Sequence, residues 1–232
     1  MKPQRAHWLQ HAEHEDSGCI EPWLISRGHQ VTHTRLFAGE SLPDASSFDW
    51  LIIMGGPMNI YEHDRHPWLI PEKKLINDAI VTNKKILGIC LGSQLLSDVL
   101  GGAVTKNKYQ EIGWFKVELT EDGVNSPYSV AGHEFLAFHW HGDTYALPPQ
   151  AKCLARSEAC GQQAFSHGAR RLGLQFHLEV TVDDAREWLK VDAPKPERYV
   201  QSVEEILRDP TRFSENNRLM RKLLEQMEAI HF

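Results

Sequence analysis

The chain has 232 residues and a formal net charge of −6, with 41% hydrophobic and 24% charged residues. This length and composition are ordinary for a globular protein with one substantial core. The negative charge and the lack of a basic run argue against a nucleic-acid partner, and no stretch approaches the 18 consecutive apolar residues that would predict a membrane span.

Strand and helix patterns alternate along the first hundred residues. A continuous apolar run at Trp50–Met54 ends at two glycines and a proline, as expected for a buried central strand. The predicted order is a strand at Ala6–Leu9, a helix at Ser17–Arg27, strands at Gln30–Leu36 and Trp50–Met54, a helix at Pro71–Asn83, a strand at Lys85–Ile89 and a helix at Leu91–Leu100. This alternation with short links predicts an α/β fold, with a mostly parallel sheet covered by helices on both faces.

The pattern changes after about residue 111, where short β-like stretches are separated by polar turns. They predict a small antiparallel extension with strands at Trp114–Leu119, Leu136–Trp140, Lys152–Ala155, Gln163–Phe165 and Leu172–Phe176. Helices are predicted at Thr181–Trp188, Tyr199–Leu207 and Pro210–Ile230, and the last has an apolar face that would pack on the core or in a homodimer. Since Val191–Glu197 is typical of a linker, we predict one domain over residues 1–190 and a C-terminal helical tail over residues 191–232.

The four cysteines form no CxxC pair and no zinc-like spacing; they are Cys19, Cys90, Cys153 and Cys160. The N-terminus has no hydrophobic stretch of the kind found in signal peptides. Both observations predict a cytoplasmic protein with reduced thiols. Only Cys90 has a sequence setting that indicates chemistry.

Cys90 stands where a buried strand passes directly into a helix, between Gly88 and Gly92. This is the spacing of a nucleophile elbow, G-x-S-x-G, with cysteine in place of serine. The helix N-terminus favours a thiolate there, and the N–H of Leu91 could hold a developing oxyanion. Gln94 lies on the same helix face and could reach a substrate over the sulfur. Because a buried cysteine packed as a small apolar side chain is the alternative, the prediction depends on a base elsewhere.

His177 and Glu179 supply such a base and the carboxylate that would orient it. Residues two apart in a strand point to the same side of the sheet, so a strand here would place both side chains on one face. A lone histidine near a strand end is more often structural. The elbow and the His-x-Glu pair together favour a catalytic triad of Cys90, His177 and Glu179.

These motifs resemble those of the class I, triad-type glutamine amidotransferases. The segment G-I-C-L-G-S-Q at residues 88–94 is similar to the family's nucleophile signature, and Q-F-H-L-E at residues 175–179 is similar to its Q-F-H-P-E motif. The turn G-G-P at residues 55–57 resembles the family's third element. The motifs follow in the family's order over roughly Trp50 to Val180. Leu178 stands where proline is usual, but its side chain should face away from Cys90, so we expect the triad to survive.

The resemblance implies a flavodoxin-like fold and a two-step acyl transfer that needs neither metal nor organic cofactor. Cys90 would attack the γ-carboxamide of glutamine or a γ-glutamyl group, and His177 would shuttle the proton. The N–H groups of Gly56 and Leu91 would contact the oxyanion, and Gln94 the substrate amide. Water would then release glutamate from the thioester.

A histidine-rich segment, F-H-W-H-G-D, occupies residues 138–143. His139, His141 and Asp143 alternate on one strand face, which allows a metal site, but no further ligand cluster is evident in the sequence. Similar H-x-H-G-D segments line the substrate pocket in stand-alone members of the resembled family. We therefore predict that His141, Gly142 and Asp143 help to hold the glutamyl group and that no metal is bound.

Three other features are weaker signals. The segment E-I-G-W at residues 111–114 also resembles stand-alone members of the family, although a strand start with a half-buried tryptophan explains it as well. His7, His11 and His14 are expected in loops or on the surface. The acidic stretch Glu13–Asp16 would edge the pocket from the first loop after a strand.

Two enzymatic functions are compatible with the sequence. The chain resembles a stand-alone version of the amidase domain of GMP synthetase, but it has no S-G-G-x-D-S motif of an ATP-pyrophosphatase, so we do not expect a complete synthetase. It would be a glutaminase that hands ammonia to a separate synthase, or a self-contained hydrolase of γ-glutamyl compounds. A catalytically silent regulatory module is a third alternative, which the intact triad argues against. A peptidase or chaperone of the related G-x-C-H-G type is disfavoured because Leu91 follows the cysteine.

Overall fold

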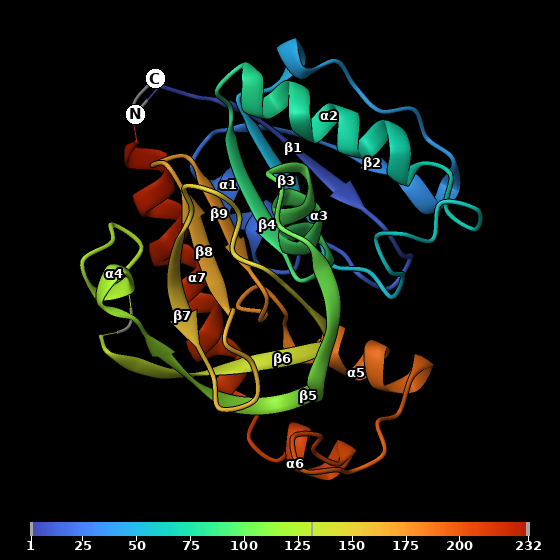
Figure 1. The fold of residues 1–232 in the computed structure, drawn as a ribbon, viewed down its shortest axis with the longest axis vertical. Helices are drawn as coiled ribbons and strands as arrows, with labels where there is room; N and C mark the ends of the chain where they lie inside the picture. Colours follow the sequence, from blue (N-terminus) through green and yellow to red (C-terminus); the bar gives the residue numbers. More distant parts are fainter. Residues whose placement is uncertain (1, 131, 231–232) are drawn as a thin grey trace.

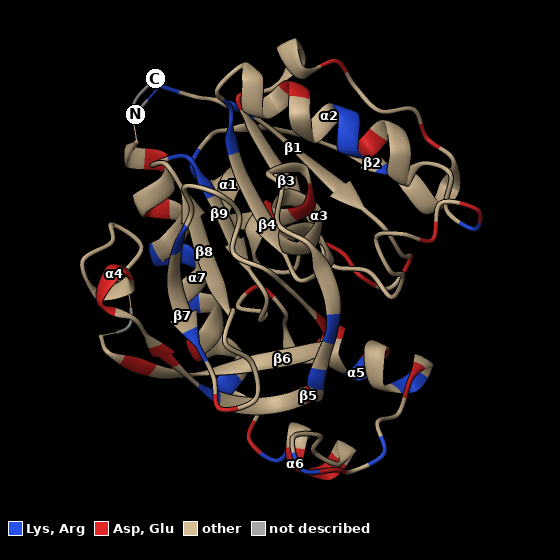
Figure 2. Cartoon of the chain, in the orientation of Figure 1, with Lys and Arg blue, Asp and Glu red and all other residues tan. Residues whose placement is uncertain are grey.

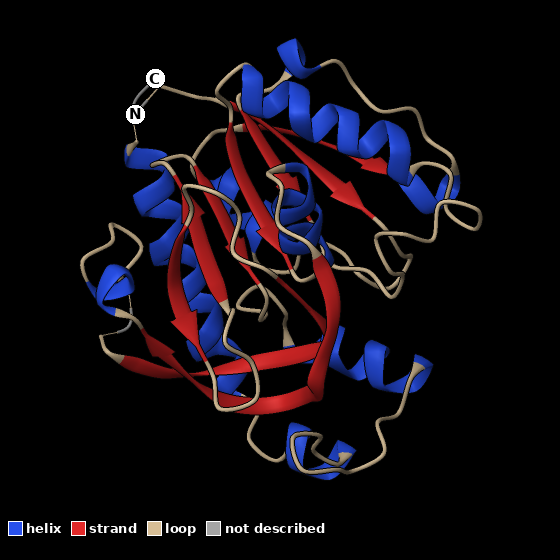
Figure 3. Ribbon diagram, in the orientation of Figure 1, coloured by secondary structure: helices blue, strands red, loops and turns tan. Residues whose placement is uncertain are grey.

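The structure, a computed structural model, describes residues 2–130 and 132–230. Among these residues, nine strands form one sheet in the order β2-β1-β3-β4-β9-β8-β7-β5-β6 (Figures 1 and 3). The strands are β1 (Arg5–Gln10), β2 (Gln30–Arg35), β3 (Trp50–Ile53), β4 (Lys85–Ile89), β5 (Val104–Leu119), β6 (Glu134–Tyr145), β7 (Lys152–Arg156), β8 (Ala164–His167) and β9 (Arg171–Leu174). The pairs that join β2, β1, β3, β4 and β9 are parallel, and the remaining pairs are antiparallel. The predicted α/β sheet with an antiparallel extension is therefore confirmed.

Helices cover both faces of the parallel strands. They are α1 (Ile20–Ser26), α2 (Leu69–Val81), α3 (Leu91–Val99), α4 (Glu121–Val124), α5 (Val182–Val191), α6 (Val203–Leu207) and α7 (Thr211–Ala229), with short 3-10 turns at Leu36–Ala38 and Ala45–Ser47. Alternate residues of β3 enter two different cores: Trp50 and Ile52 pack with α1 and α7, while Leu51 and Ile53 pack with α2 and α3. Burial on both faces explains why this strand is apolar without interruption.

The C-terminal helix α7 belongs to the same hydrophobic core as α1. Leu219, Met220, Leu223, Leu224 and Met227 are buried in it. Their spacing places them on one face of the helix, as its apolar pattern predicts. The division of the chain at residue 190 stays a prediction. Acidic and basic residues are spread over the fold (Figure 2), and no helix among the described residues is long and apolar enough to cross a membrane.

Several predicted elements differ in extent from the structure. The strand expected from Trp114 begins at Val104, with an irregularity between Lys106 and Glu111. The strand expected to reach Phe176 ends at Leu174.

The helix expected from Tyr199 begins only at Val203. Tyr199 accepts a hydrogen bond from the N–H of Ile112 through its backbone carbonyl, at 2.9 Å, which holds this segment extended along β5. Ser202 then caps α6 in a capping box with Glu205. Pairing with β5 therefore overrides the helical spacing before residue 202.

Candidate active site

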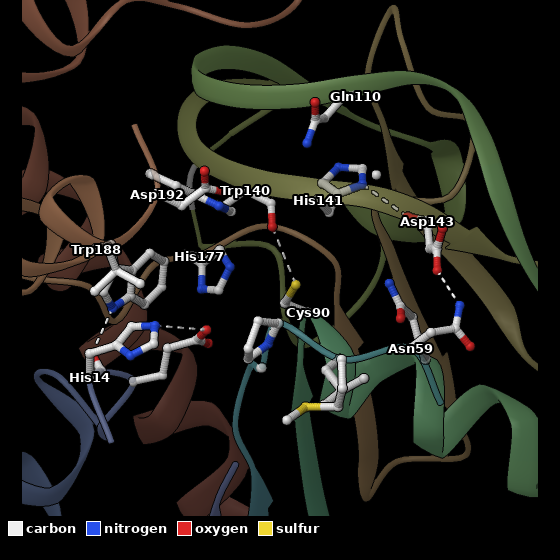
Figure 4. A pocket seen from close by; sticks show the side chains of 18 of the residues that line it. His14, Asn59, Cys90, Gln110, Trp140, His141, Asp143, His177, Trp188 and Asp192 are labelled. Carbon is white, nitrogen blue, oxygen red and sulfur yellow. Dashed lines mark hydrogen bonds and ion pairs between the residues drawn. The ribbon is translucent and has the colours of Figure 1, made fainter. Parts of the chain in front are cut away.

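A cavity of about 450 Å³ opens where the parallel strands end (Figure 4). In open α/β sheets, ligands bind at this carboxyl edge. The cavity is lined by His14, Glu15, Gly56, Pro57, Met58, Asn59, Glu62, Cys90, Leu91, Gln94, Gln110, Trp140, His141, Gly142, Asp143, His177, Trp188, Val191 and Asp192. The structure therefore brings Cys90 and His177 of the predicted triad, and every predicted oxyanion or substrate contact, to one cavity.

Cys90 occupies a sharp turn between β4 and α3. Its backbone has φ +50° and ψ −109°, a left-handed conformation that side chains other than glycine rarely adopt. Gly92 is required here because a Cβ atom at that position would clash with the carbonyl oxygen of Ile53. The thiol lies 3.6 Å from the carbonyl oxygen of Trp140. A strained residue in the sharp turn between a strand and a helix, here Cys90 between β4 and α3, is typical of a nucleophile elbow.

His177 and Glu179 contact each other directly. Nδ1 of His177 lies 2.6 Å from Oε1 of Glu179, and both side chains are buried. The prediction that they share a strand is wrong, because β9 ends before them at Leu174. An isolated bridge holds the segment instead: the N–H of His177 donates to the carbonyl of Phe138 at 2.8 Å. The ring of His177 lies beside the Cys90 thiol in Figure 4.

Two side chains from the C-terminal region support this pair. The Nδ2 amide of Asn217, on α7, donates to the backbone carbonyls of Leu178, Glu179 and Val180 at 2.9, 3.1 and 3.0 Å. The indole of Trp188, on α5, packs edge-on against the ring of His177 with centroids 5.0 Å apart. The segment after residue 181 therefore contributes to the geometry of the site.

The surroundings of His177 favour its charged form. Burial by itself lowers the pKa of this imidazole, but the Glu179 carboxylate, the neighbouring Cys90 thiol and the hydrogen bond to Glu179 outweigh burial and raise the pKa well above its usual value. A charged imidazole beside a thiol is the arrangement that can protonate a leaving group.

The peptide between Gly55 and Gly56 is held by a buried pair behind it. Nδ1 of His11 donates to the Gly55 carbonyl at 2.9 Å, and Nε2 lies 2.8 Å from Oε1 of Glu72, on α2. Burial opposes the charge on His11, but Glu72 and the Gly55 carbonyl raise the pKa of this imidazole above its usual value. In a trans peptide, N–H and C=O point in opposite directions. The N–H of Gly56 therefore points away from His11, on the side of the cavity that Gly56 lines.

The other predicted contacts lie around the thiol. Leu91 is the first residue of α3, where the N–H has no acceptor within the helix. The side-chain amide of Gln94 donates to Oε1 of Gln175 at 3.1 Å. Asp143 accepts a hydrogen bond from Nδ2 of Asn59 at 2.6 Å, and Nδ1 of His141 donates to the Asp143 backbone carbonyl at 3.0 Å. Their roles toward a substrate stay predictions.

A group of side chains that could hold a cation includes His141, but it differs from the group of His139, His141 and Asp143 that the sequence suggested. Glu111, His139 and His141 can each offer a ligand atom, and these atoms lie within 4.8 Å of one another, whereas Asp143 is not among them. The Glu111 carboxylate accepts hydrogen bonds from Ser157 at 2.8 Å and from Gln163 at 2.7 Å. Nε2 of His141 lies 3.1 Å from the same carboxylate.

Residues near the N-terminus take a larger part than the sequence indicates. The expectation of a loop or surface position is wrong for His7, which is buried in β1, whereas His11 lies in the loop after β1, as expected, and is buried there. His7 sits in β1 and bonds to hydroxyls of β2 at 2.8 and 3.0 Å. Glu15 lines the cavity, as expected for its acidic stretch. For His11 and Glu15, the position directly after the first parallel strand was the only signal in the sequence.

Comparisons with known proteins identify the family of this chain. A family model described as "Glutamine amidotransferase class-I" matches residues 20–192. The glutamine amidotransferase-like protein YfeJ of Salmonella typhimurium is 32% identical over 98% of this chain and 98% of its own length. A glutamine-hydrolysing GMP synthase of Aeropyrum pernix is 32% identical over 73% of this chain, which spans only 32% of that enzyme. The solved structure of a glutamine amidotransferase from Methylobacillus flagellatus is 28% identical, with a TM-score of 0.91 over 98% of this chain and 95% of that one.

Proposed function

The chain belongs to the class I glutamine amidotransferase family, and from this premise we propose that it hydrolyses the γ-carboxamide of glutamine or of a γ-glutamyl compound. The observation that carries the proposal is that one cavity is lined by the strained Cys90, by His177, which lies 2.6 Å from the Glu179 carboxylate, and by Gly56 and Leu91. Nucleophile, oriented base and oxyanion donors are the three parts that amide hydrolysis through a thioester requires.

The first half-reaction forms the thioester. The Cys90 sulfur attacks the carboxamide carbon, and negative charge develops on the carbonyl oxygen. The N–H groups of Gly56 and Leu91 would stabilise that charge. The His177 imidazolium, oriented by Glu179, then gives its Nε2 proton to the leaving nitrogen as the carbon–nitrogen bond breaks.

The second half-reaction releases glutamate. Water occupies the place of the departed amine, and neutral His177 takes a proton from it. The resulting nucleophile attacks the thioester carbon, the same oxyanion donors act again, and the carbon–sulfur bond breaks to regenerate the cysteine. Gln94, His141, Gly142 and Asp143 would hold the glutamyl group throughout, from the side of the cavity that they line.

The fate of the released nitrogen separates two candidate functions. The similarity to a glutamine-hydrolysing GMP synthase supports delivery of ammonia to a separate synthase. The cavity supports a self-contained γ-glutamyl hydrolase, because about 450 Å³ is the size of a pocket for a drug-sized ligand. In addition, Trp188, Val191 and Asp192 of this chain line it. We propose the glutaminase as the function and the γ-glutamyl hydrolase as its alternative.

Glutamate release by the purified chain distinguishes these functions. We expect glutamine to be hydrolysed, faster when a cognate synthase is added. A set of γ-glutamyl peptides and amides hydrolysed by the chain alone, faster than glutamine, would instead establish the self-contained hydrolase. No release from any of these substrates, with or without candidate synthases, would contradict both.

A substitution behind the oxyanion donors tests the mechanism. We expect His11→Gln to lower kcat about 100-fold, because the Gly56 N–H loses its fixed direction and one oxyanion donor contributes about that factor. Alkylation of Cys90 by iodoacetamide forms no oxyanion, so the alkylation rate of the His11→Gln variant should stay close to that of the wild type. His7→Gln is the matched control, since His7 is a buried histidine of β1 that bonds to β2. Equal kcat values for the two variants would argue against this role of His11.

A further inference from the structure

We propose that the carboxyl group of Glu15 receives the leaving amine as an ammonium ion, which makes the His177 side of the cavity a subsite for primary amines. The proposal rests on the proposed function and adds to it the chemical class of the leaving group. It assigns a direct contact with the departing nitrogen to a residue outside the predicted triad.

The backbone around Glu15 is fixed at the end of β1. The N–H of Glu15 donates to the carbonyl of Ala12 at 3.2 Å, which closes a tight turn. The side-chain amide of Gln10 donates to the carbonyls of Ala12 and Glu13 at 3.0 and 3.4 Å, so the last residue of the strand holds the turn from inside. Glu15 is therefore presented to the cavity by a constrained loop.

The glycine turn makes room for this carboxyl group beside the triad. A Cβ atom at Gly55 would lie 2.6 Å from Oε2 of Glu15, 3.3 Å from Cε1 of His177 and 3.7 Å from Cβ of Cys90. Glu15, His177 and Cys90 thus border the same small space, which only a residue without a side chain leaves open. The Glu15 carboxyl lies next to the edge of the imidazole that would protonate the leaving group.

The carboxyl group has no hydrogen-bond partner among the described residues. Its side chain is only 13% exposed, and its nearest ionic neighbour is Nε2 of His14 at 4.0 Å. Burial raises the pKa of Glu15 to about 7, despite opposing effects of His177 and His11. A buried carboxyl without a partner is unfavourable unless a ligand supplies one. Because the group lines the cavity, that ligand is the substrate or its product.

The direction of the reaction places an amine there. In Figure 4, His14, Trp188 and Asp192 lie on the His177 side of Cys90, and Asn59 and Asp143 lie on the other side. Since His177 protonates the leaving nitrogen, that nitrogen departs on the His177 side of the cavity. The glutamyl group then extends toward Asn59 and Asp143.

The charges of the cavity match an ammonium ion. Its lining includes the carboxyl groups of Glu15, Glu62, Asp143 and Asp192 but, among the described residues, neither lysine nor arginine. Glu62 and Asp143 already accept hydrogen bonds from Asn59. Glu15 and Asp192 are left for a cation. The indole of Trp188 offers an apolar surface to the carbon chain of a bound amine. An amine with an adjacent carboxylate would be repelled, so the site should prefer simple primary amines and ammonia to amino acids.

The protons balance without a further reactant. When the carbon–nitrogen bond breaks, His177 gives one proton to the nitrogen and a neutral amine forms. The carboxylic acid of Glu15 then gives its proton to that amine, which leaves an ammonium ion paired with a carboxylate. After water has cleaved the thioester, the proton lost by the new carboxylic acid restores Glu15 as the ammonium ion departs. The cycle yields one carboxylate and one ammonium ion for each water consumed.

Partitioning of the thioester between methylamine and water tests the subsite. With glutamine as donor, the ratio of γ-glutamyl methylamide to glutamate does not depend on the acylation rate or on the fraction of active protein. We expect Glu15→Gln to lower this ratio about tenfold or more, as loss of a charge-assisted hydrogen bond would. Glu13→Gln, an exposed neighbour in the same turn, should leave it unchanged. Glycine should compete less well than methylamine in the wild type, and the difference should narrow in Glu15→Gln.

A second measurement needs no turnover. Methylammonium should slow the alkylation of Cys90 by iodoacetamide in a saturable way, and this protection should be lost in Glu15→Gln and partly restored in Glu15→Asp. If wild type and Glu15→Gln show the same ratio and the same protection, the subsite is refuted while glutamine hydrolysis stands. If the wild type hydrolyses no γ-glutamyl amide, the proposed function itself fails.

Discussion

The substitution Cys90→Ala is expected to reduce glutamate release from glutamine and from every γ-glutamyl substrate by about 10⁴-fold or more, since loss of a covalent nucleophile removes the whole thioester route. The oxyanion donors would still polarise a bound amide, but His177 would have no thiol to act with. Folding should survive, because alanine is smaller and keeps both neighbouring elements. The measurement is glutamate release alongside a thermal unfolding curve.

Cys153→Ala is the matched control for this loss. Cys153 is a half-buried thiol of β7, whose pKa is raised by burial, and it does not line the cavity. We expect full activity in this variant and unchanged labelling of Cys90 by a glutamine-like electrophile. Wild-type turnover in Cys90→Ala, with an unchanged unfolding curve, would show that the sequence motif is not the source of catalysis.

Local patterns predicted the part of the site that depends on neighbouring residues. The strand before Cys90 has its predicted bounds, and the helix after it ends one residue early, at Val99. The glycine at position 92 is needed where the spacing of the motif placed it. An elbow needs only one strand, one turn and one helix, so a short segment carries the whole signal.

Non-local contacts explain what the sequence did not predict. His11 bonds to Gly55 and to Glu72, which are 44 and 61 residues away, and no pattern around His11 records either contact. The pairing of His177 and Glu179 was predicted for the wrong reason, since a bridge to Phe138 and not a continuous strand positions them. The fold class could be predicted from the alternation of strand and helix patterns along the chain. These contacts, in contrast, depend on how elements far apart in the sequence pack together.

The second large effect concerns the carboxylate behind His177. We expect Glu179→Gln to lower kcat/KM about 10³- to 10⁴-fold, because an amide can neither hold the imidazole in the same orientation nor stabilise its charge. Burial lowers the pKa of His177, and Glu179 is the main group that raises it above its usual value. Removing that charge should therefore bring the pKa of His177 down.

The pH profile separates this electrostatic role from a structural one. A raised pKa keeps His177 charged up to a higher pH, so activity should fall only as pH rises through that raised pKa. In Glu179→Gln the alkaline limb should move to lower pH, together with the loss in rate. Glu187→Gln, an exposed carboxylate of α5 paired with Lys190, should change neither the rate nor the limb. A Glu179→Gln variant whose alkaline limb stays in place would mean that Glu179 orients the imidazole without setting its charge, and the acid–base assignment of His177 would then have to be revised.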